Sequence, residues 1–225
     1  MLRERQQTEA LDVRQALTEW LRALGLNLSP EQIEKLYSHY SLLLTWNEKI
    51  NLTSIRDPLL IVRRHFLDSG AIVRFLSPVG RFLDVGSGAG FPGIPVKVLL
   101  PEKEIFLIES YRKKANFLRE VIRQLDLKKA TVLEKRLETA SPQETGSFDE
   151  VITRAFGSFG IFLKLSFLFL RPGGTSIIMH GPQGKEIFSA LKDKAREIGF
   201  ARGRIETYLL PFGKEQRTAL IFSKS

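Results

Sequence analysis

The chain has 225 residues, of which 43% are hydrophobic and 26% charged, a balance typical of a folded α/β domain with a small extension and not of a disordered chain. It contains no cysteine, which excludes disulfides and thiolate metal sites and fits a reducing cytosol. A charged N-terminus and the lack of any apolar run of roughly 20 residues argue against a signal peptide or a membrane span, so we expect a cytoplasmic protein.

The net charge is +9, and the basic excess lies in the second part of the chain. Residues 1–79 hold 10 basic and 9 acidic side chains, which leaves 24 basic and 16 acidic side chains for residues 80–225. A basic surface attracts phosphate backbones because binding releases counterions. Nucleic acid is therefore the leading class of partner, with a merely solvated basic surface as the alternative.

The first third of the chain predicts helices. Four leucines recur at helical spacing before Gly25, namely Leu11, Leu17, Leu21 and Leu24. Ser29 and Pro30 then supply an N-cap and a proline at the first helical position, so we expect a helix from there to about Trp46. Residues 47–56 are polar, and Asp57 followed by Pro58 predicts a further helix that ends near residue 75.

From Arg81 onward, short apolar runs alternate with helical stretches. The expected strands are residues 81–86, 104–110, 131–135, 149–154, 174–180, 204–210 and 218–223. This alternation predicts a Rossmann-like α/β domain over residues 80–225, with a mostly parallel sheet of about seven strands, after an N-terminal helical extension over residues 1–79. The last two strands are joined by a segment too short for a covering helix, so they should pair antiparallel.

A glycine-rich segment follows the first expected strand and precedes an apolar helix. It reads GSGAGFPG over residues 86–93, and its glycines permit a tight turn to which a ligand can approach closely. The start of the helix adds unpaired backbone N–H donors. A nucleotide-like ligand is implied, and the GxGxG spacing differs from the GxGxxG of dinucleotide-binding proteins.

Two acidic residues accompany this turn. Asp84 lies two residues before the first glycine, and Glu109 ends the next strand, where its carboxylate would meet a ribose diol. Taken singly, Asp84 could cap a turn and Glu109 could be a solvated strand end. Together with the glycine turn, they favour a methyltransferase over a nicotinamide-dependent enzyme.

Five segments carry a resemblance to a known family. They are NLTSIRDPLLIVRRHFLDS (residues 51–69), FLDVGSGAGFPGIP (82–95), LIESYRKKANFL (107–118), VITRAF (151–156) and LRPGG (170–174). The chain resembles the small-subunit ribosomal RNA methyltransferase G family, also called glucose-inhibited division protein B. The resemblance implies a class I methyltransferase fold and transfer of a methyl group from S-adenosyl-L-methionine to N7 of one guanine in 16S ribosomal RNA. The partner would be this RNA or a precursor of the small ribosomal subunit.

The resemblance also implies cofactor-binding residues. The family's positions fall on Gly86, Phe91, Glu109, Ser110, Leu137, Glu138 and Arg154, and the glycine turn adds Asp84, Gly88 and Gly90 to the expected set. Two features depart from the family pattern. His180 stands where we expect a lysine, and the first 25 or so residues carry no pattern that we can place.

The chemistry of guanine N7 limits what the enzyme must do. N7 has an in-plane lone pair and no proton, so we expect no general base, and the main task is to align N7 with the methyl group. Because N7 lies on the narrow major-groove edge of an RNA helix, the base should be unpaired and held between apolar side chains. Phe156 and Phe159 are candidates, with simple core packing as the alternative.

Further side chains are candidates for binding the RNA. The basic residues Arg112, Lys113, Lys114, Arg119 and Arg123 would contact phosphates, as would Lys128, Lys129 and the basic residues between 185 and 204, although each cluster also fits a solvated face. His65 and Asp68 lie on one side of a predicted helix. With Asn51 they would close over the cofactor or the base, or else dock the extension on the sheet.

Other functions stay open at this point. The three histidines show no metal-ligand spacing, so we expect no metal, and a monomer is the default. The same fold could serve a methyltransferase for a protein or a small molecule. A third possibility is an RNA-binding assembly factor whose cofactor site has decayed, although the intact glycine turn argues against it.

Overall fold

The structure is a computed structural model that describes residues 13–139, 146–154 and 156–225. Residues 13–22 are helical, and the later helices are α2 (Pro30–Asn47), α3 (Pro58–Ile61), α4 (Asp68–Ile72), α5 (Gly93–Leu99), α6 (Arg112–Gln124), α7 (Phe159–Phe169) and α8 (Gly184–Ile198). The strands are β1 (Arg81–Val85), β2 (Glu104–Ile108), β3 (Ala130–Leu133), β4 (Phe148–Thr153), β5 (Leu170–His180), β6 (Phe200–Leu209) and β7 (Gln216–Lys224). In this part of the chain, no helix combines the length and apolar character needed to cross a membrane.

The strands form one sheet in the order β3-β2-β1-β4-β5-β7-β6. Strands β1 to β5 are parallel to one another, whereas β7 runs antiparallel to both β5 and β6. The predicted α/β fold and the antiparallel final pair are confirmed. Because the chain moves outward from β1 in both directions, the carboxyl ends of β1 and β4 meet at the switch point where such sheets bind ligands.

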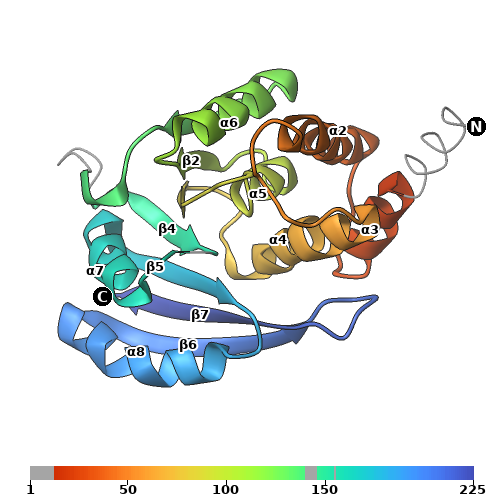
Figure 1. The fold of residues 1–225 in the computed structure, drawn as a ribbon. Coiled ribbons are helices and arrows are strands. Elements are labelled where there is room, and N and C mark those ends of the chain that lie inside the picture. Colours follow the sequence, from red (N-terminus) through yellow and green to blue (C-terminus); the bar gives the residue numbers. More distant parts are fainter. Residues whose placement is uncertain (1–12, 140–145, 155) are drawn as a thin grey trace, which may run out of the picture.

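Helices cover both faces of this sheet (Figure 1). Side chains alternate along each strand. Phe82 and Ile177 join a core shared with the helical extension, α5 and α6, while their neighbours Leu83 and Ile178 join a second core with α7 and α8. The extension therefore shares a core with the sheet, and its boundary at residue 79 stays a prediction.

Local signals fix the starts of α2 and α3 as expected. Ser29 and Gln32 form a reciprocal capping box at α2, and the side chain of Asp57 accepts a hydrogen bond from the backbone N–H of Leu60. The helix expected to end near residue 75 is interrupted by a π-helical stretch, η1 (Val62–Leu67), and closes with a 3₁₀ turn, η2 (Val73–Phe75). A π turn holds one extra residue, which periodicity alone does not reveal. The first expected leucine, Leu11, lies outside the described residues.

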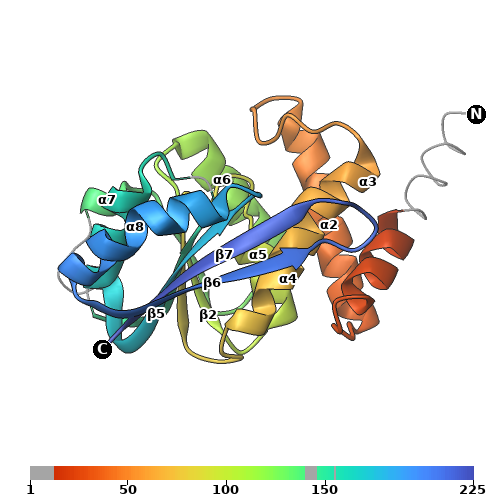
Figure 2. The ribbon, with the colours of Figure 1, turned by 90° about the horizontal axis from the view of Figure 1, so that it is seen from below.

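The hairpin between β6 and β7 reaches past the sheet to the extension (Figure 2). The ring of Phe212 stacks on Trp20, with centroids 5.3 Å apart, and Arg63 forms an ion pair with Glu215 at 2.9 Å. Arg63 also donates a hydrogen bond to the carbonyl of Phe212. These contacts bring the last two strands against helices more than 140 residues away in the sequence.

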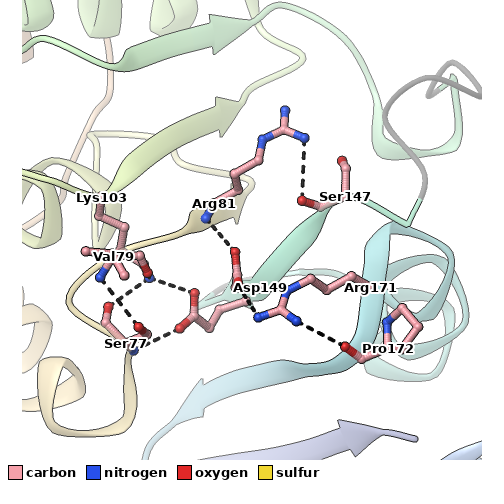
Figure 3. A network of polar contacts seen from close by, with 9 residues as sticks. Ser77, Val79, Arg81, Lys103, Ser147, Asp149, Arg171 and Pro172 are labelled. Carbon is pink, nitrogen blue, oxygen red and sulfur yellow. Dashed lines mark hydrogen bonds and ion pairs between the residues drawn. The ribbon is translucent and has the colours of Figure 1, made fainter.

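A polar network ties the end of the extension to the amino ends of β1, β2 and β4 (Figure 3). Lys103 is fully buried, and its ammonium group forms an ion pair with Glu150 at 2.8 Å while donating to the carbonyls of Ser77 and Val79 at 2.9 Å each. Beside it, Asp149 accepts a hydrogen bond from the backbone N–H of Arg81. These contacts fix the loop before β1 at the amino ends of the strands, on the side of the sheet away from their carboxyl ends.

Candidate functional site

The turn after β1 exposes bare backbone. Gly86 and Gly88 have positive φ angles of 73° and 55°, which side chains rarely adopt. A Cβ added at Gly86 would meet no atom within 4 Å, and one at Gly88 would meet only a carbonyl oxygen at 3.8 Å. Both glycines thus face open space, where a ligand can lie directly against the main chain.

Glu109, at the end of β2, is joined to this turn. One carboxylate oxygen accepts the backbone N–H of Gly88 at 3.0 Å, and the other accepts the N–H of Tyr111 at 2.8 Å. The side chain is only 5% exposed, yet it lines the cleft beside the turn. The two backbone donors fix the carboxylate at the edge of the cleft, with lone pairs left for a further donor.

Asp84 and Gly90 lie behind the turn. Asp84 is completely buried, accepts the backbone N–H of Gly93 at 3.0 Å, and has its pKa raised to about 7 by burial. A Cβ at Gly90 would strike Ile94 at 2.7 Å. Neither residue is part of the cleft lining, so both act on a ligand through the shape of the turn, and their predicted contact with the cofactor has no support in this geometry.

The cleft itself has a volume of about 630 Å³ and opens at the carboxyl ends of the strands. It brings together most of the predicted cofactor residues: Gly86, Gly88, Phe91, Glu109, Ser110, Leu137, Glu138 and Arg154. Phe156 also lines it, as do Leu52 and Tyr111, which the sequence did not single out. Tyr111 could not be predicted as a cleft residue, because a single exposed tyrosine after a strand gives no periodic pattern in the sequence.

The ring of Phe91 lies between two histidines. His39 of α2 stacks on it at a centroid distance of 4.8 Å, and His65 of η1 stacks at 4.7 Å. The Nε2 atom of His39 lies 2.9 Å from the carbonyl of Ala89 and must donate to it, since a carbonyl can only accept. Burial lowers the pKa of His39 to about 4. The extension therefore supports the glycine turn from behind through a neutral histidine that sequence reasoning did not propose for the site.

His65 uses both of its ring nitrogens. Arg154 donates to Nδ1 at 3.1 Å, and because a guanidinium has no acceptor, Nε2 must carry the proton and donate to the hydroxyl of Thr53 at 3.0 Å. Burial, with Arg154 as a lesser cause, lowers the pKa of His65 to about 3. His65 thus holds Arg154 in place and is not free to act as a base.

A second hollow, of about 290 Å³, adjoins the cleft. Its lining includes His65, Asp68, His180 and Arg217, and it shares Arg154 with the cleft. Burial raises the pKa of Asp68, whereas the nearby Arg217 and Arg154 oppose that rise. The structure thus brings His65 and Asp68 together, as predicted. Asn51 does not line this hollow but a separate one, formed by residues 51–54 and 56.

The basic residues of α6 fall into two groups. Arg112 and Lys113 are exposed, and no ion pair to them is seen within the described residues. Arg119 and Arg123 instead form ion pairs with Glu134 and Glu120, at 2.7 Å each. Lys114 lies over the exposed ring of Tyr111, 5.3 Å from its centroid, at the rim of the cleft. The exposed charges of Arg112 and Lys113 thus lie at the start of α6, directly after Tyr111, which lines the cleft.

No group of three or more histidine, aspartate or glutamate side chains that could hold a metal ion is present in the described ranges. The cleft, in contrast, has the form expected for a nucleoside ligand. Bare backbone, a fixed carboxylate and an apolar wall meet at the switch point of the sheet.

Solved structures with the same fold include proteins that depend on or bind S-adenosylmethionine. A methyltransferase from Aquifex aeolicus, described as dependent on S-adenosylmethionine, superposes with a TM-score of 0.57 at 18% identity, covering 73% of this chain and 93% of that one. TYW2 of M. jannaschii, solved in complex with AdoMet, superposes with a TM-score of 0.56 at 16% identity over 69% and 73% of the two chains. The fold is therefore that of the S-adenosylmethionine-dependent methyltransferases.

Sequence comparisons give the family. The family model described as rRNA small subunit methyltransferase G matches residues 32–210. The Ribosomal RNA small subunit methyltransferase G of Acetivibrio thermocellus is 37% identical over 220 residues, covering 95% of this chain and 89% of that protein, and the one from Desulfitobacterium hafniense is 36% identical over 204 residues, covering 90% and 85%. The chain belongs to the rRNA small subunit methyltransferase G family.

Proposed function

We propose that this protein transfers the methyl group of S-adenosyl-L-methionine to N7 of a guanine in 16S ribosomal RNA. The observation that carries the proposal is the turn at Gly86 and Gly88, which presents bare backbone to the cleft beside the fixed carboxylate of Glu109. Membership of the rRNA small subunit methyltransferase G family supplies the substrate class.

The residues of the cleft fit an adenosyl ligand. Gly86 and Gly88 leave room for its close approach, Glu109 offers lone pairs to a ribose diol, and Leu137, 2% exposed, provides an apolar wall. When bound, the sulfonium supplies both the methyl group and its own leaving group. The protein then needs only to hold the acceptor atom in line with the methyl carbon, because a well-oriented reaction gains several kcal/mol from position alone.

No general base is required at N7, and two groups near the cleft that could act as one are occupied or enclosed. The two nitrogens of His65 are engaged by Arg154 and Thr53, and Asp84 is shut off behind the turn. We therefore assign these groups to holding the site in shape. The exposed charges of Arg112 and Lys113, with the ring of Tyr111, form the rim along which the RNA backbone would lie.

We also propose that the protein works in the cytoplasm as a monomer and without a metal ion, since methylation at N7 requires no metal chemistry. Two alternatives explain the structure less well. A methyltransferase that acts on protein does not account for the basic residues beside the cleft. An RNA-binding factor with a decayed cofactor site does not account for the open glycine turn.

Transfer of a tritiated methyl group tests the proposal. The protein is incubated with labelled cofactor and with naked 16S ribosomal RNA, intact small subunits or a protein extract, and the product is digested to nucleosides. The expected label is in 7-methylguanosine from RNA. Label found only in protein, or in another nucleoside, overturns the proposal.

A further inference from the structure

The hollow beside the cofactor cleft is a separate compartment with its own polar lining. It measures about 290 Å³ and lies between the helical extension, at Asp68, and the carboxyl end of β5, at His180. Arg154 is part of the wall of both spaces. A volume just below the range of ordinary small-molecule pockets suits a single flat base better than a whole nucleotide chain.

Polar atoms in this hollow are poorly satisfied. Asp68 is 4% exposed, and its contacts with the hydroxyl of Tyr208 and with Nε of Arg217 both reach the same oxygen, at the long distances of 3.4 and 3.5 Å. Nε of Arg217 and Nδ1 of His180 are buried and have no hydrogen-bond partner among the described residues. Buried polar atoms in folded proteins are nearly always hydrogen-bonded, so this arrangement points to a missing partner.

We propose that this hollow receives the target guanine, with the carboxylate of Asp68 accepting hydrogen bonds from N1–H and the N2 amino group, and with Arg217 and His180 facing O6. The proposal rests on the proposed function, because it assigns the base-binding part of the same site. It also gives a role to His180, which replaces the lysine expected from the family pattern with another side chain that can donate.

The pattern of donors and acceptors selects guanine. Only guanine presents two neighbouring donors, N1–H and N2–H, which match the two oxygens of one carboxylate, and it adds the acceptor O6 next to them. Adenine places an acceptor at N1 and a donor at N6, which would oppose both Asp68 and Arg217. Holding the Watson–Crick edge in this way leaves N7 without a hydrogen bond, as the reaction requires.

Inosine in place of the target guanosine tests the contact with Asp68, because inosine keeps N1–H, O6 and N7 but lacks the N2 amino group. A synthetic segment carrying either nucleoside is ligated into 16S ribosomal RNA and assembled into small subunits, and kcat/KM for methyl transfer is measured. We expect the inosine substrate to react about tenfold or more slowly with the wild-type protein. Equal rates would overturn the proposal.

The variant Asp68→Asn links this penalty to the residue. An amide offers one acceptor and one donor, so the variant should lose activity on guanosine, and its ratio of guanosine to inosine rates should fall towards 1. The matched control is Asp193→Asn, an exposed carboxylate of α8 paired with Arg196, which should keep the wild-type ratio. A wild-type ratio in Asp68→Asn would overturn the proposal. If Asp68→Asn does not fold, the wild-type comparison alone decides.

The experiments distinguish a wrong assignment of the guanine pocket from a wrong proposed function. Binding of S-adenosyl-L-methionine is measured by calorimetry for each protein, and it should be unchanged in Asp68→Asn. Methyl transfer to guanosine without any inosine penalty rejects the pocket alone. No transfer to small-subunit RNA by the wild-type protein rejects the proposed function and this inference together.

Discussion

Gly88 donates its backbone N–H to the carboxylate of Glu109 at 3.0 Å, which joins the glycine turn after β1 to the end of the neighbouring strand β2. The bond fixes the spacing between bare backbone and acid at the edge of the cleft. Both features are those that a ligand with a ribose diol requires. The cofactor-binding role that we propose for this cleft therefore depends on a contact between two residues that are 21 positions apart.

Gly88→Ala should weaken cofactor binding beyond what its loss of stability explains. Its φ of 55° strains any side chain by about 1–2 kcal/mol, and the added methyl group enters the cleft. The matched control is Gly25→Ala, with a φ of 81° and equally open surroundings but a position outside the cleft. Both variants should unfold at lower temperature, whereas calorimetry should show at least tenfold weaker cofactor binding in Gly88→Ala alone. Equal affinities would contradict this assignment.

Glu109→Gln should weaken cofactor binding and also destabilise the fold by about 1–3 kcal/mol, because the amide nitrogen cannot accept the second backbone N–H. The amide keeps one acceptor for the Tyr111 or Gly88 N–H but loses the charge that strengthens a hydrogen bond to a hydroxyl, a change of about 1.5–3 kcal/mol, or roughly tenfold or more in Kd. Glu102→Gln, which alters an exposed carboxylate near Lys129, is the control and should bind normally. Unchanged cofactor affinity in Glu109→Gln would contradict a hydrogen bond between the ribose and this carboxylate.

The glycine turn, the acid at the end of β2 and the starts of α2 and α3 could be predicted because local sequence determines them. Asp84 and Glu109 both end strands, and nothing in the sequence tells which acid faces the cleft. Asp84 turns behind the loop because Gly93 offers it a backbone N–H nine residues later. The support from His39 could not be predicted either, since its partner Ala89 is 50 residues away and a buried histidine has no local signal.

His39→Gln should reduce the loss of stability in mild acid. The folded protein holds His39 neutral, with a pKa of about 4 against an ordinary 6.5, so below pH 6.5 the unfolded chain binds a proton that the folded chain does not. Falling pH thus favours unfolding, and His39 contributes about 2 kcal/mol of this loss between pH 7 and pH 5. The lowered pKa of His65 also makes the fold less stable as the pH falls, whereas the raised pKa of Asp84 makes it more stable. Both residues are retained in the variant, so their effects cancel in the comparison. Urea unfolding at the two pH values measures the difference, and an identical pH dependence would refute the prediction.

Lys103→Met should destabilise the fold strongly. It leaves the carboxylate of Glu150 buried without its partner, which typically costs about 3–5 kcal/mol. Lys129→Met breaks an exposed pair with Glu102 and should change stability little, because solvent screens such a pair. Denaturant midpoints compare the two variants. A small effect of Lys103→Met would show that the network of Figure 3 contributes little to stability.

The rim charges should account for RNA affinity. The double variant Arg112→Ala/Lys113→Ala removes two exposed charges, so the slope of log K against log salt for binding to 16S RNA should fall by about 2. Arg119→Ala/Arg123→Ala removes the same charge from the same helix. Because these arginines are held in ion pairs with Glu134 and Glu120, we expect a smaller change. Equal slopes for both variants would place the RNA elsewhere.

Calorimetric titration of the wild-type protein with S-adenosyl-L-methionine is the most direct test of the cofactor site at Gly86, Gly88 and Glu109. We predict binding of one molecule per chain with a Kd on the order of micromolar, and a loss of that binding in Gly88→Ala. Absence of binding at cofactor concentrations on the order of millimolar would contradict the account.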